Sequence, residues 1–129
     1  MRAENIKELG RQGEIIAANY LRKNGYEILT MNFKNDLGYR RGELDIVARD
    51  ASTKEVVFVE VKTLKKNYYS GNPEKAITRQ KYQKLAKIIS NYINRNKLNA
   101  SAYRLDAISV EFDLKERKAT LKHLKHIYY

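Results

Sequence analysis

The spacing of apolar residues along the first half of the chain predicts a helix followed by three strands. Apolar side chains recur every three to four positions over residues 4–24, as on one face of an α-helix. Residues 26–34 are expected to form a first strand. Residues 42–49 and 56–62 are each short, rich in β-branched residues and bounded by polar ones, which is typical of strands.

The second half predicts one more helix and two more strands. An apolar stripe over residues 74–95 predicts a long, basic helix that starts just after Pro73, the single proline of the chain. Residues 103–112 and 119–124 predict the last two strands.

The predicted order is therefore α-β-β-β-α-β with a C-terminal strand. The crossover from residues 56–62 through the basic helix to residues 103–112 is long enough for a right-handed connection, which gives a mixed sheet. We expect an α/β sandwich, with helices packed on that sheet. A length of 129 residues with 43% apolar content suits one globular domain over residues 1–129.

The alternation of side chains also predicts how strands 42–49 and 56–62 pair. The polar segment between them is short, so the two strands should form an antiparallel hairpin. One register makes one face of the hairpin wholly apolar, whereas a slip of one residue would mix the two faces. The pairs in this register are Leu44 with Val61, Ile46 with Val59, and Ala48 with Val57.

Two carboxylates face each other in the same register. Asp45 lies opposite Glu60 on the other face of the hairpin, beside Lys62. Opposed Cβ atoms are about 5 Å apart, so the two carboxylates repel each other unless a cation lies between them. Hard Mg²⁺ prefers carboxylate oxygens, and a lysine close by can orient a water molecule or balance charge. A surface ion pair of Glu60 with Lys62 or Lys65 is the simpler alternative.

The first predicted helix contains two glycines, Gly10 and Gly13, which lower its intrinsic stability. A close approach of the helix to the sheet would compensate for them. Glu14 lies one turn after Gly10, so its carboxylate can point at a neighbouring strand. Taken alone, the segment favours a solvated glutamate.

The charge of the chain points to polyanionic partners. There are 26 Lys and Arg against 15 Asp and Glu, a net charge of +11, which favours nucleic acid first and an acidic membrane surface second, with ordinary solubility charge as the alternative. The absence of Cys excludes disulfides, zinc ribbons and thiol chemistry. His123 and His126 are compatible with a metal site, but polar surface is the commoner role for such a pair. With a polar start and no apolar run of spanning length, we expect a cytoplasmic protein without a membrane segment.

Three short motifs carry a resemblance to a known family. They are residues 13–17 (Gly-Glu-Ile-Ile-Ala), 42–48 (Gly-Glu-Leu-Asp-Ile-Val-Ala) and 58–63 (Phe-Val-Glu-Val-Lys-Thr). In this order they resemble the signatures of the YraN family, over nearly the whole chain from about Gly10. The resemblance implies the restriction-endonuclease-like fold, a three-layer sandwich of the PD-(D/E)XK nuclease superfamily, similar to archaeal Holliday-junction resolvases.

The resemblance also implies roles for individual residues. Glu14, Asp45 and Glu60 would hold Mg²⁺ or Mn²⁺, with the Val61 carbonyl as a further ligand, and Lys62 would position or stabilise the nucleophile. A set of basic residues is expected to grip the phosphate backbone. They are Lys34, Arg40, Arg41, Lys65, Lys66, Arg79, Lys81 and Lys84.

The leading hypothesis is thus a metal-dependent nuclease that hydrolyses DNA, including branched or recombination-intermediate DNA. The alternative is a nucleic-acid-binding module that keeps the fold without efficient catalysis. A basic RNA- or ribosome-associated protein is a third interpretation, which rests on charge alone. A symmetric homodimer would suit a cut in both strands.

Overall fold

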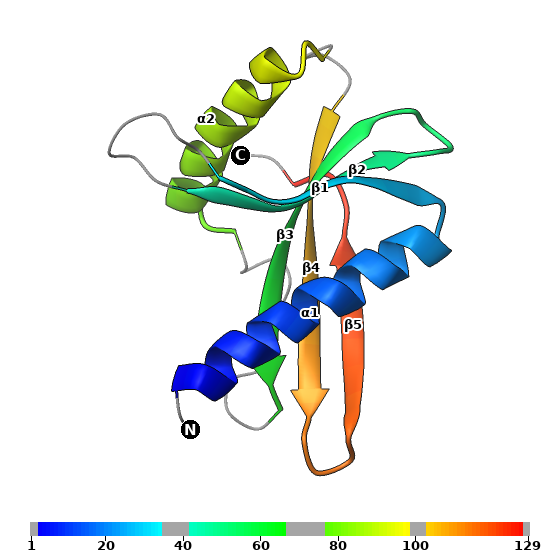
Figure 1. The fold of residues 1–129 in the computed structure, drawn as a ribbon, viewed down its shortest axis with the longest axis vertical. Helices are drawn as coiled ribbons and strands as arrows, with labels where there is room; N and C mark the ends of the chain where they lie inside the picture. Colours follow the sequence, from blue (N-terminus) through cyan, green and yellow to red (C-terminus); the bar gives the residue numbers. More distant parts are fainter. Residues whose placement is uncertain (1–2, 35–41, 67–76, 99–102, 128–129) are drawn as a thin grey trace.

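The computed structural model describes residues 3–34, 42–66, 77–98 and 103–127. Two helices and five strands follow one another along the chain (Figure 1) in the predicted order, and together they form a mixed α/β fold. Their bounds are α1 Ala3–Lys23, β1 Tyr26–Lys34, β2 Glu43–Asp50, β3 Val56–Lys65, α2 Arg79–Arg95, β4 Tyr103–Asp113 and β5 Lys118–Leu124.

All five strands belong to one open sheet, in which they lie side by side in the order β1-β2-β3-β4-β5. The neighbours β3 and β4 are parallel, and the other three pairs are antiparallel. Because α2 lies between β3 and β4 in the chain, it supplies the long crossover that a parallel pair needs. The predicted mixed sheet is therefore confirmed.

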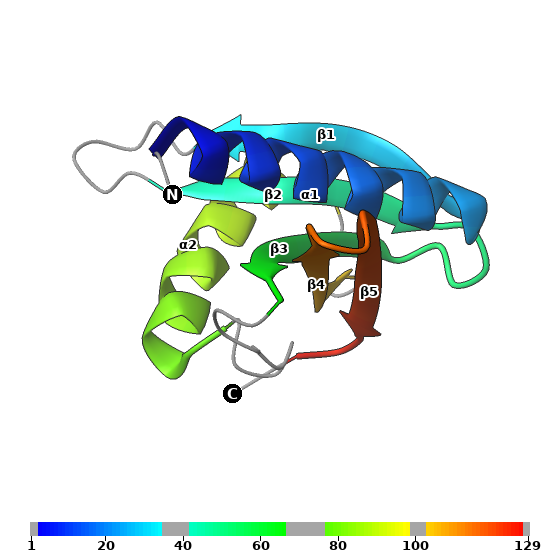
Figure 2. The same cartoon turned by 90° about the horizontal axis from the view of Figure 1, so that it is seen from below.

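The helices cover opposite faces of this sheet. Val47 of β2 packs in a buried cluster with the apolar side chains of α2, whereas its neighbours Ile46 and Ala48 pack in a second cluster with those of α1. Successive side chains of a strand point to opposite faces, which explains the division. Figures 1 and 2 show α1 running across the sheet, with α2 beside one end of it. Both faces of the β2–β3 hairpin are therefore covered.

The β2–β3 register is confirmed in its central part and wrong at its end. Ile46 pairs with Val59 and Ala48 pairs with Val57, as predicted, but the ladder stops at the Ile46–Val59 pair. Leu44 is not paired with Val61. It packs instead in the cluster on the α2 side, because the two strands separate beyond the last pair.

Two predicted element ends differ from the structure by more than one residue. Strand β3 continues past residue 62 to Lys65, which pairs with Phe112 of β4. Helix α2 begins at Arg79 instead of residue 74, since Thr78 caps it by accepting a hydrogen bond from the Lys81 amide at 3.1 Å. Pro73 and residues 74–76 lie outside the described residues.

The two glycines of α1 have different surroundings. A Cβ atom at Gly13 would come within 2.1 Å of the Thr63 Oγ1 atom on β3, so the predicted close approach of helix and sheet is confirmed there. A Cβ atom at Gly10 would meet no described atom within 4 Å, so the same prediction is wrong for Gly10.

A buried polar network connects α1 to strands β4 and β5 of the sheet. Arg104 donates to Asp106 at 3.0 Å and to Asp50 at 2.9 Å. His123 contacts Asp106 at 2.7 Å through Nε2 and the Tyr20 hydroxyl at 2.8 Å through Nδ1. The interpretation of His123 as polar surface is therefore wrong, since its side chain is only 5% exposed. Burial raises the pKa of Asp106, but hydrogen bonds from His123 and Arg104 outweigh it and hold this pKa below its usual range.

Neither described helix has the combination of length and hydropathy that a membrane span requires.

Candidate active site

Carboxylates from three elements converge where β2 and β3 separate. Glu14 comes from α1, Asp45 from β2 and Glu60 from β3. The side chains of Asp45 and Glu60 share a hydrogen bond, and carboxylate oxygens of Glu14, Glu43 and Asp45 lie within 4.8 Å of one another. The structure thus brings together the three acidic residues that the sequence singled out and adds Glu43 to them.

The end of the β2–β3 ladder positions Asp45. Past the last backbone pair, the Val61 amide donates to the Asp45 Oδ2 atom at 2.8 Å instead of to a backbone carbonyl of β2. The side chain therefore takes the place of a strand partner, and it is only 9% exposed. This geometry holds the carboxyl group rigidly between the two strands.

Burial and mutual repulsion raise the pKa values of two carboxyl groups in the site, Asp45 and Glu14. Burial, then the charge of Glu60, raises the pKa of Asp45 to about 8, although the Val61 hydrogen bond acts in the opposite direction. Burial also raises the pKa of Glu14, with further contributions from Glu43 and Glu60. Proton binding at Asp45 is therefore favoured in the metal-free protein. A bound cation would replace that proton and relieve the repulsion.

Two neighbours of the acidic group were missed by the sequence analysis. Glu43 precedes Asp45 by two residues in β2, and this period of two was the signal that would have placed both carboxylates on one face. Asn32 of β1 donates to Glu14 and to Glu43 at 3.0 Å each when its amide nitrogen faces the carboxylates. Its positive φ of 56° turns the backbone of β1 at this point, and no pattern in the sequence predicted this contact.

Lys81 lies inside the site instead of on its rim. Its Nζ atom is 2.5 Å from the Glu60 Oε1 atom, and its side chain is 46% exposed. Lys81 lies in the first turn of α2, which Thr78 caps. This position places its ammonium beside Glu60 of β3. The Lys81 ammonium thus forms an ion pair with Glu60. Its expected contact with the phosphate backbone stays a prediction.

Lys62 follows Glu60 by two residues on β3 and is half-buried. By the alternation of the strand it belongs to the same face as Glu60. Val61, between them, is fastened to Asp45 by its amide. That Glu60 and Lys62 present a carboxylate and an ammonium to one place stays a prediction.

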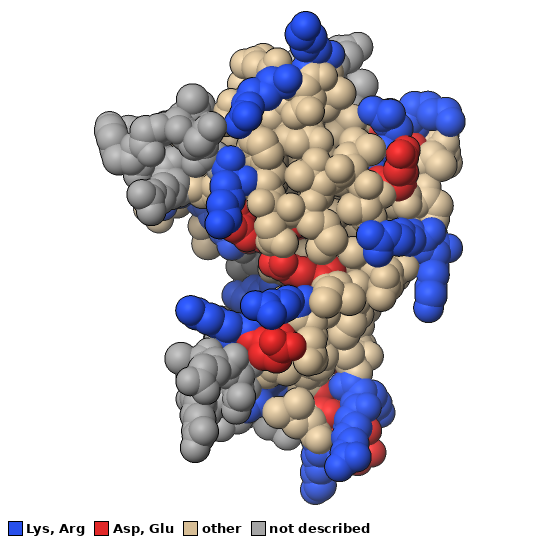
Figure 3. Space-filling model, in the orientation of Figure 1, with Lys and Arg blue, Asp and Glu red and all other residues tan. Residues whose placement is uncertain are grey.

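The other basic residues are distributed unevenly. Lys34, Arg79 and Lys84 are exposed, while Lys66 forms an ion pair with Asp113 at 3.3 Å. Lys65 lines a pocket beside Glu14. Arg40 and Arg41 lie outside the described residues. Figure 3 shows acidic side chains in the middle of one face with Lys and Arg side chains on either side of them.

The donor set suits a hard divalent cation. All the converging groups offer oxygen atoms, which Mg²⁺ and Mn²⁺ prefer. The raised pKa of Asp45 has two physical causes, burial and the crowding of carboxyl groups around it, and a bound cation would offset both. Glu14, Asp45 and Glu60 therefore fit as ligands, with Glu43 as an additional candidate.

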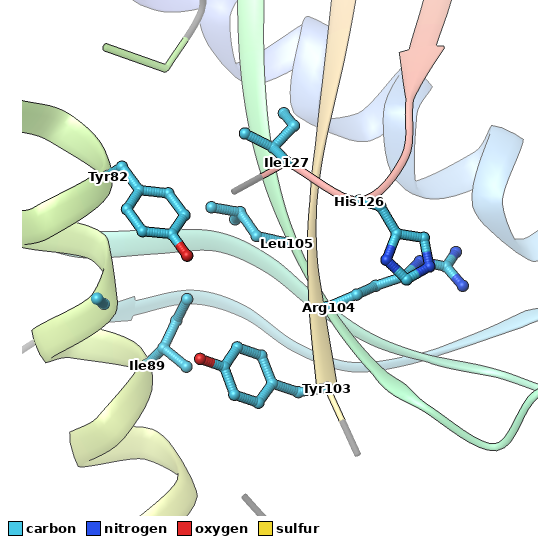
Figure 4. A pocket seen from close by; sticks show the side chains of 8 residues that line it. Tyr82, Ile89, Tyr103, Arg104, Leu105, His126 and Ile127 are labelled. Carbon is cyan, nitrogen blue, oxygen red and sulfur yellow. The ribbon is translucent and has the colours of Figure 1, made fainter. Parts of the chain in front are cut away.

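A second pocket, of about 230 Å³, lies between α2 and β4 and is separate from these carboxylates. Figure 4 shows the rings of Tyr82 and Tyr103 directed into it, while the guanidinium of Arg104 turns away. No Asp or Glu is among the described residues that line this pocket.

Comparison with known proteins identifies relatives along nearly the full chain. The profile of a family described as "Uncharacterised protein family UPF0102" matches residues 13–110. A UPF0102 protein of Caldicellulosiruptor saccharolyticus is 36% identical over 96% of this chain and 99% of its own. A relative from Caldanaerobacter subterraneus is 39% identical over 98% of this chain and 97% of its own.

A UPF0102 protein of Geobacter metallireducens is 40% identical over 82% of this chain and 81% of its own. The profile match spans all three motifs, from Gly13 to the end of β3, and includes Glu14, Asp45 and Glu60. This chain, with its acidic group between α1, β2 and β3, therefore belongs to the uncharacterised protein family UPF0102.

Proposed function

We propose that the protein is a metal-dependent nuclease that hydrolyses phosphodiester bonds of DNA, built on a restriction-endonuclease-like sandwich. The observation that carries the proposal is the convergence of Glu14, Asp45 and Glu60, with Lys62 two residues after Glu60 on β3. A helix on each face of a mixed sheet, with the acidic residues on the first helix and on the hairpin, supports the proposed fold.

Each residue has a role in this proposal that follows from its position. Asp45 and Glu60 would hold the cation, together with Glu14 from α1. When bound, Mg²⁺ or Mn²⁺ supplies Lewis acidity and lowers the pKa of water. Lys62 orients the attacking water or balances the charge that develops on the phosphate.

Substrate binding is assigned to the basic side chains around this acidic group. If Glu60 held a cation, the Lys81 ammonium that now pairs with Glu60 would be available to a phosphate oxygen. Exposed Lys34, Arg79 and Lys84 contact the backbone of the nucleic acid without reading its sequence.

A cleavage panel tests the proposal. Linear, flapped, gapped and four-way DNA are incubated with the protein and either Mg²⁺ or Mn²⁺, with Asp45→Ala and Glu60→Ala as matched controls. We expect cleavage that needs the cation and both carboxylates. The proposal fails if the wild type cuts none of these substrates, or if Asp45→Ala cuts as the wild type does. Nucleic-acid binding that persists without cleavage would favour a binding module instead.

A further inference from the structure

Gly10 lies within α1, and none of the described residues makes a packing contact there that requires a glycine. A Cβ atom there would meet no described atom within 4 Å, in contrast to Gly13, where the side chain of Thr63 leaves no room. Glycine is among the least favourable residues inside a helix. The open space above Gly10 therefore calls for a reason other than the packing of α1 on the sheet.

This space is one end of a pocket of about 270 Å³ between α1 and the end of β3. The pocket is continuous with the candidate active site, because Glu14 and Val61 belong to both. Its described lining residues are Leu9, Gly10, Glu14, Val61, Thr63, Leu64 and Lys65.

The groups that line the pocket complement the parts of a nucleotide. Leu9 and Leu64 offer apolar surface to a base, the Thr63 hydroxyl can donate to or accept from its edge, and Lys65 brings an ammonium for a phosphate. The volume lies below the usual range of about 300–1,000 Å³ for ligand pockets. It therefore suits one nucleotide instead of a segment of duplex.

We propose that this pocket accepts one unpaired nucleotide of the DNA strand, next to the phosphodiester bond that is cut. The inference rests on the proposed nuclease function and names its substrate class. A base inside a duplex is stacked and paired, so it has to leave the helix before it can enter such a pocket. DNA with unpaired nucleotides, such as a flap or a single strand, should therefore bind in preference to continuous duplex.

Gly10→Ala and Gly10→Leu test the inference by filling the pocket from the helix side. Binding of fluorescent oligonucleotides is measured by anisotropy in Ca²⁺, for a flapped DNA and a fully paired DNA of equal length. We expect both variants to be more stable than the wild type in thermal unfolding, since each replaces glycine in a helix. Affinity of Gly10→Leu for the flapped DNA should fall by about tenfold, the effect of one lost base contact, while affinity for the duplex stays unchanged.

Gln12→Leu is the matched control, because Gln12 is exposed on the same helix and does not line the pocket. It should bind both DNAs as the wild type does. Unchanged binding of the flapped DNA by Gly10→Leu would overturn the inference, and so would an equal loss on duplex. Loss of stability in Gly10→Ala would also overturn it, because the space would then be filled by the protein itself. Calorimetric Mn²⁺ binding to the same variants reports separately on the proposed metal site, so the two failures are distinguishable.

Discussion

Replacement of Asp45 by Asn should stabilise the metal-free protein at neutral and alkaline pH. Asn keeps the acceptor for the Val61 amide and, like the protonated carboxyl group, donates towards Glu60, but it carries no charge. The folded protein keeps the Asp45 proton up to a pKa of about 8, whereas the ordinary value is 3.8. Ionising Asp45 therefore costs on the order of 5 kcal/mol more in the folded protein, at ~1.4 kcal/mol for each pKa unit.

The sign of the pH dependence follows from proton linkage. Between pH 4 and 8 the folded wild type binds more protons at Asp45 than the unfolded chain, so the free energy of unfolding falls as the pH rises. Asp45→Asn lacks this contribution. The two proteins should have similar stability near pH 4, and the variant should become more stable by up to about 5 kcal/mol at pH 8.

Urea unfolding at several pH values between 4 and 8 measures the difference directly. Asp113→Asn is a control of opposite sign, because a hydrogen bond from the Glu116 amide, with further help from Lys66, lowers the pKa of Asp113. That variant should be less stable than the wild type at neutral pH and approach it as the pH falls. Mn²⁺ should raise the unfolding temperature of the wild type, with release of protons, but not that of Asp45→Asn. Parallel pH profiles of wild type and Asp45→Asn would refute the reasoning.

Four further predictions concern the site and its supports. Lys81→Met should bind Mn²⁺ more tightly, by several-fold in calorimetry, because an ammonium no longer competes for Glu60; weaker binding would contradict this. Gly13→Ala should destabilise the protein by about 1–3 kcal/mol in urea unfolding, since its methyl group overlaps the Thr63 side chain. Lys62→Ala should lower the cleavage rate with little change in Mn²⁺ affinity, because a protonated amine is not a ligand; an equal loss of both would argue against its role. Affinity for duplex DNA should fall steeply with added salt by counterion release, and binding that is independent of salt would contradict the basic surface.

Local patterns in the sequence were sufficient to predict most elements. Strand β1 has the predicted bounds, and α1 differs from the predicted helix by one residue at each end. The central β2–β3 register was predictable because a single register makes one face of the hairpin wholly apolar. These signals depend only on neighbours in the chain, so no distant contact is needed to interpret them.

The elements that differed from prediction depend on distant partners. Strand β3 runs on to Lys65 because β4, almost fifty residues later, continues the ladder. The hairpin has two apolar faces because α2 covers the second one, which alternation within the hairpin does not reveal. Leu44 packs on the α2 side instead of the predicted side, because β2 and β3 are no longer paired at this position. Its side chain can therefore join the apolar cluster beneath α2.

For the candidate site, the sequence alone determined which residue types are available, and the fold decided how they act. The motifs named Glu14, Asp45, Glu60 and Lys62 through a family resemblance. Only the tertiary structure placed Lys81 on Glu60 and raised the pKa of Asp45 to about 8. Electrostatic interactions depend on distance and on burial, and both arise only when α1, β2, β3 and α2 are packed together.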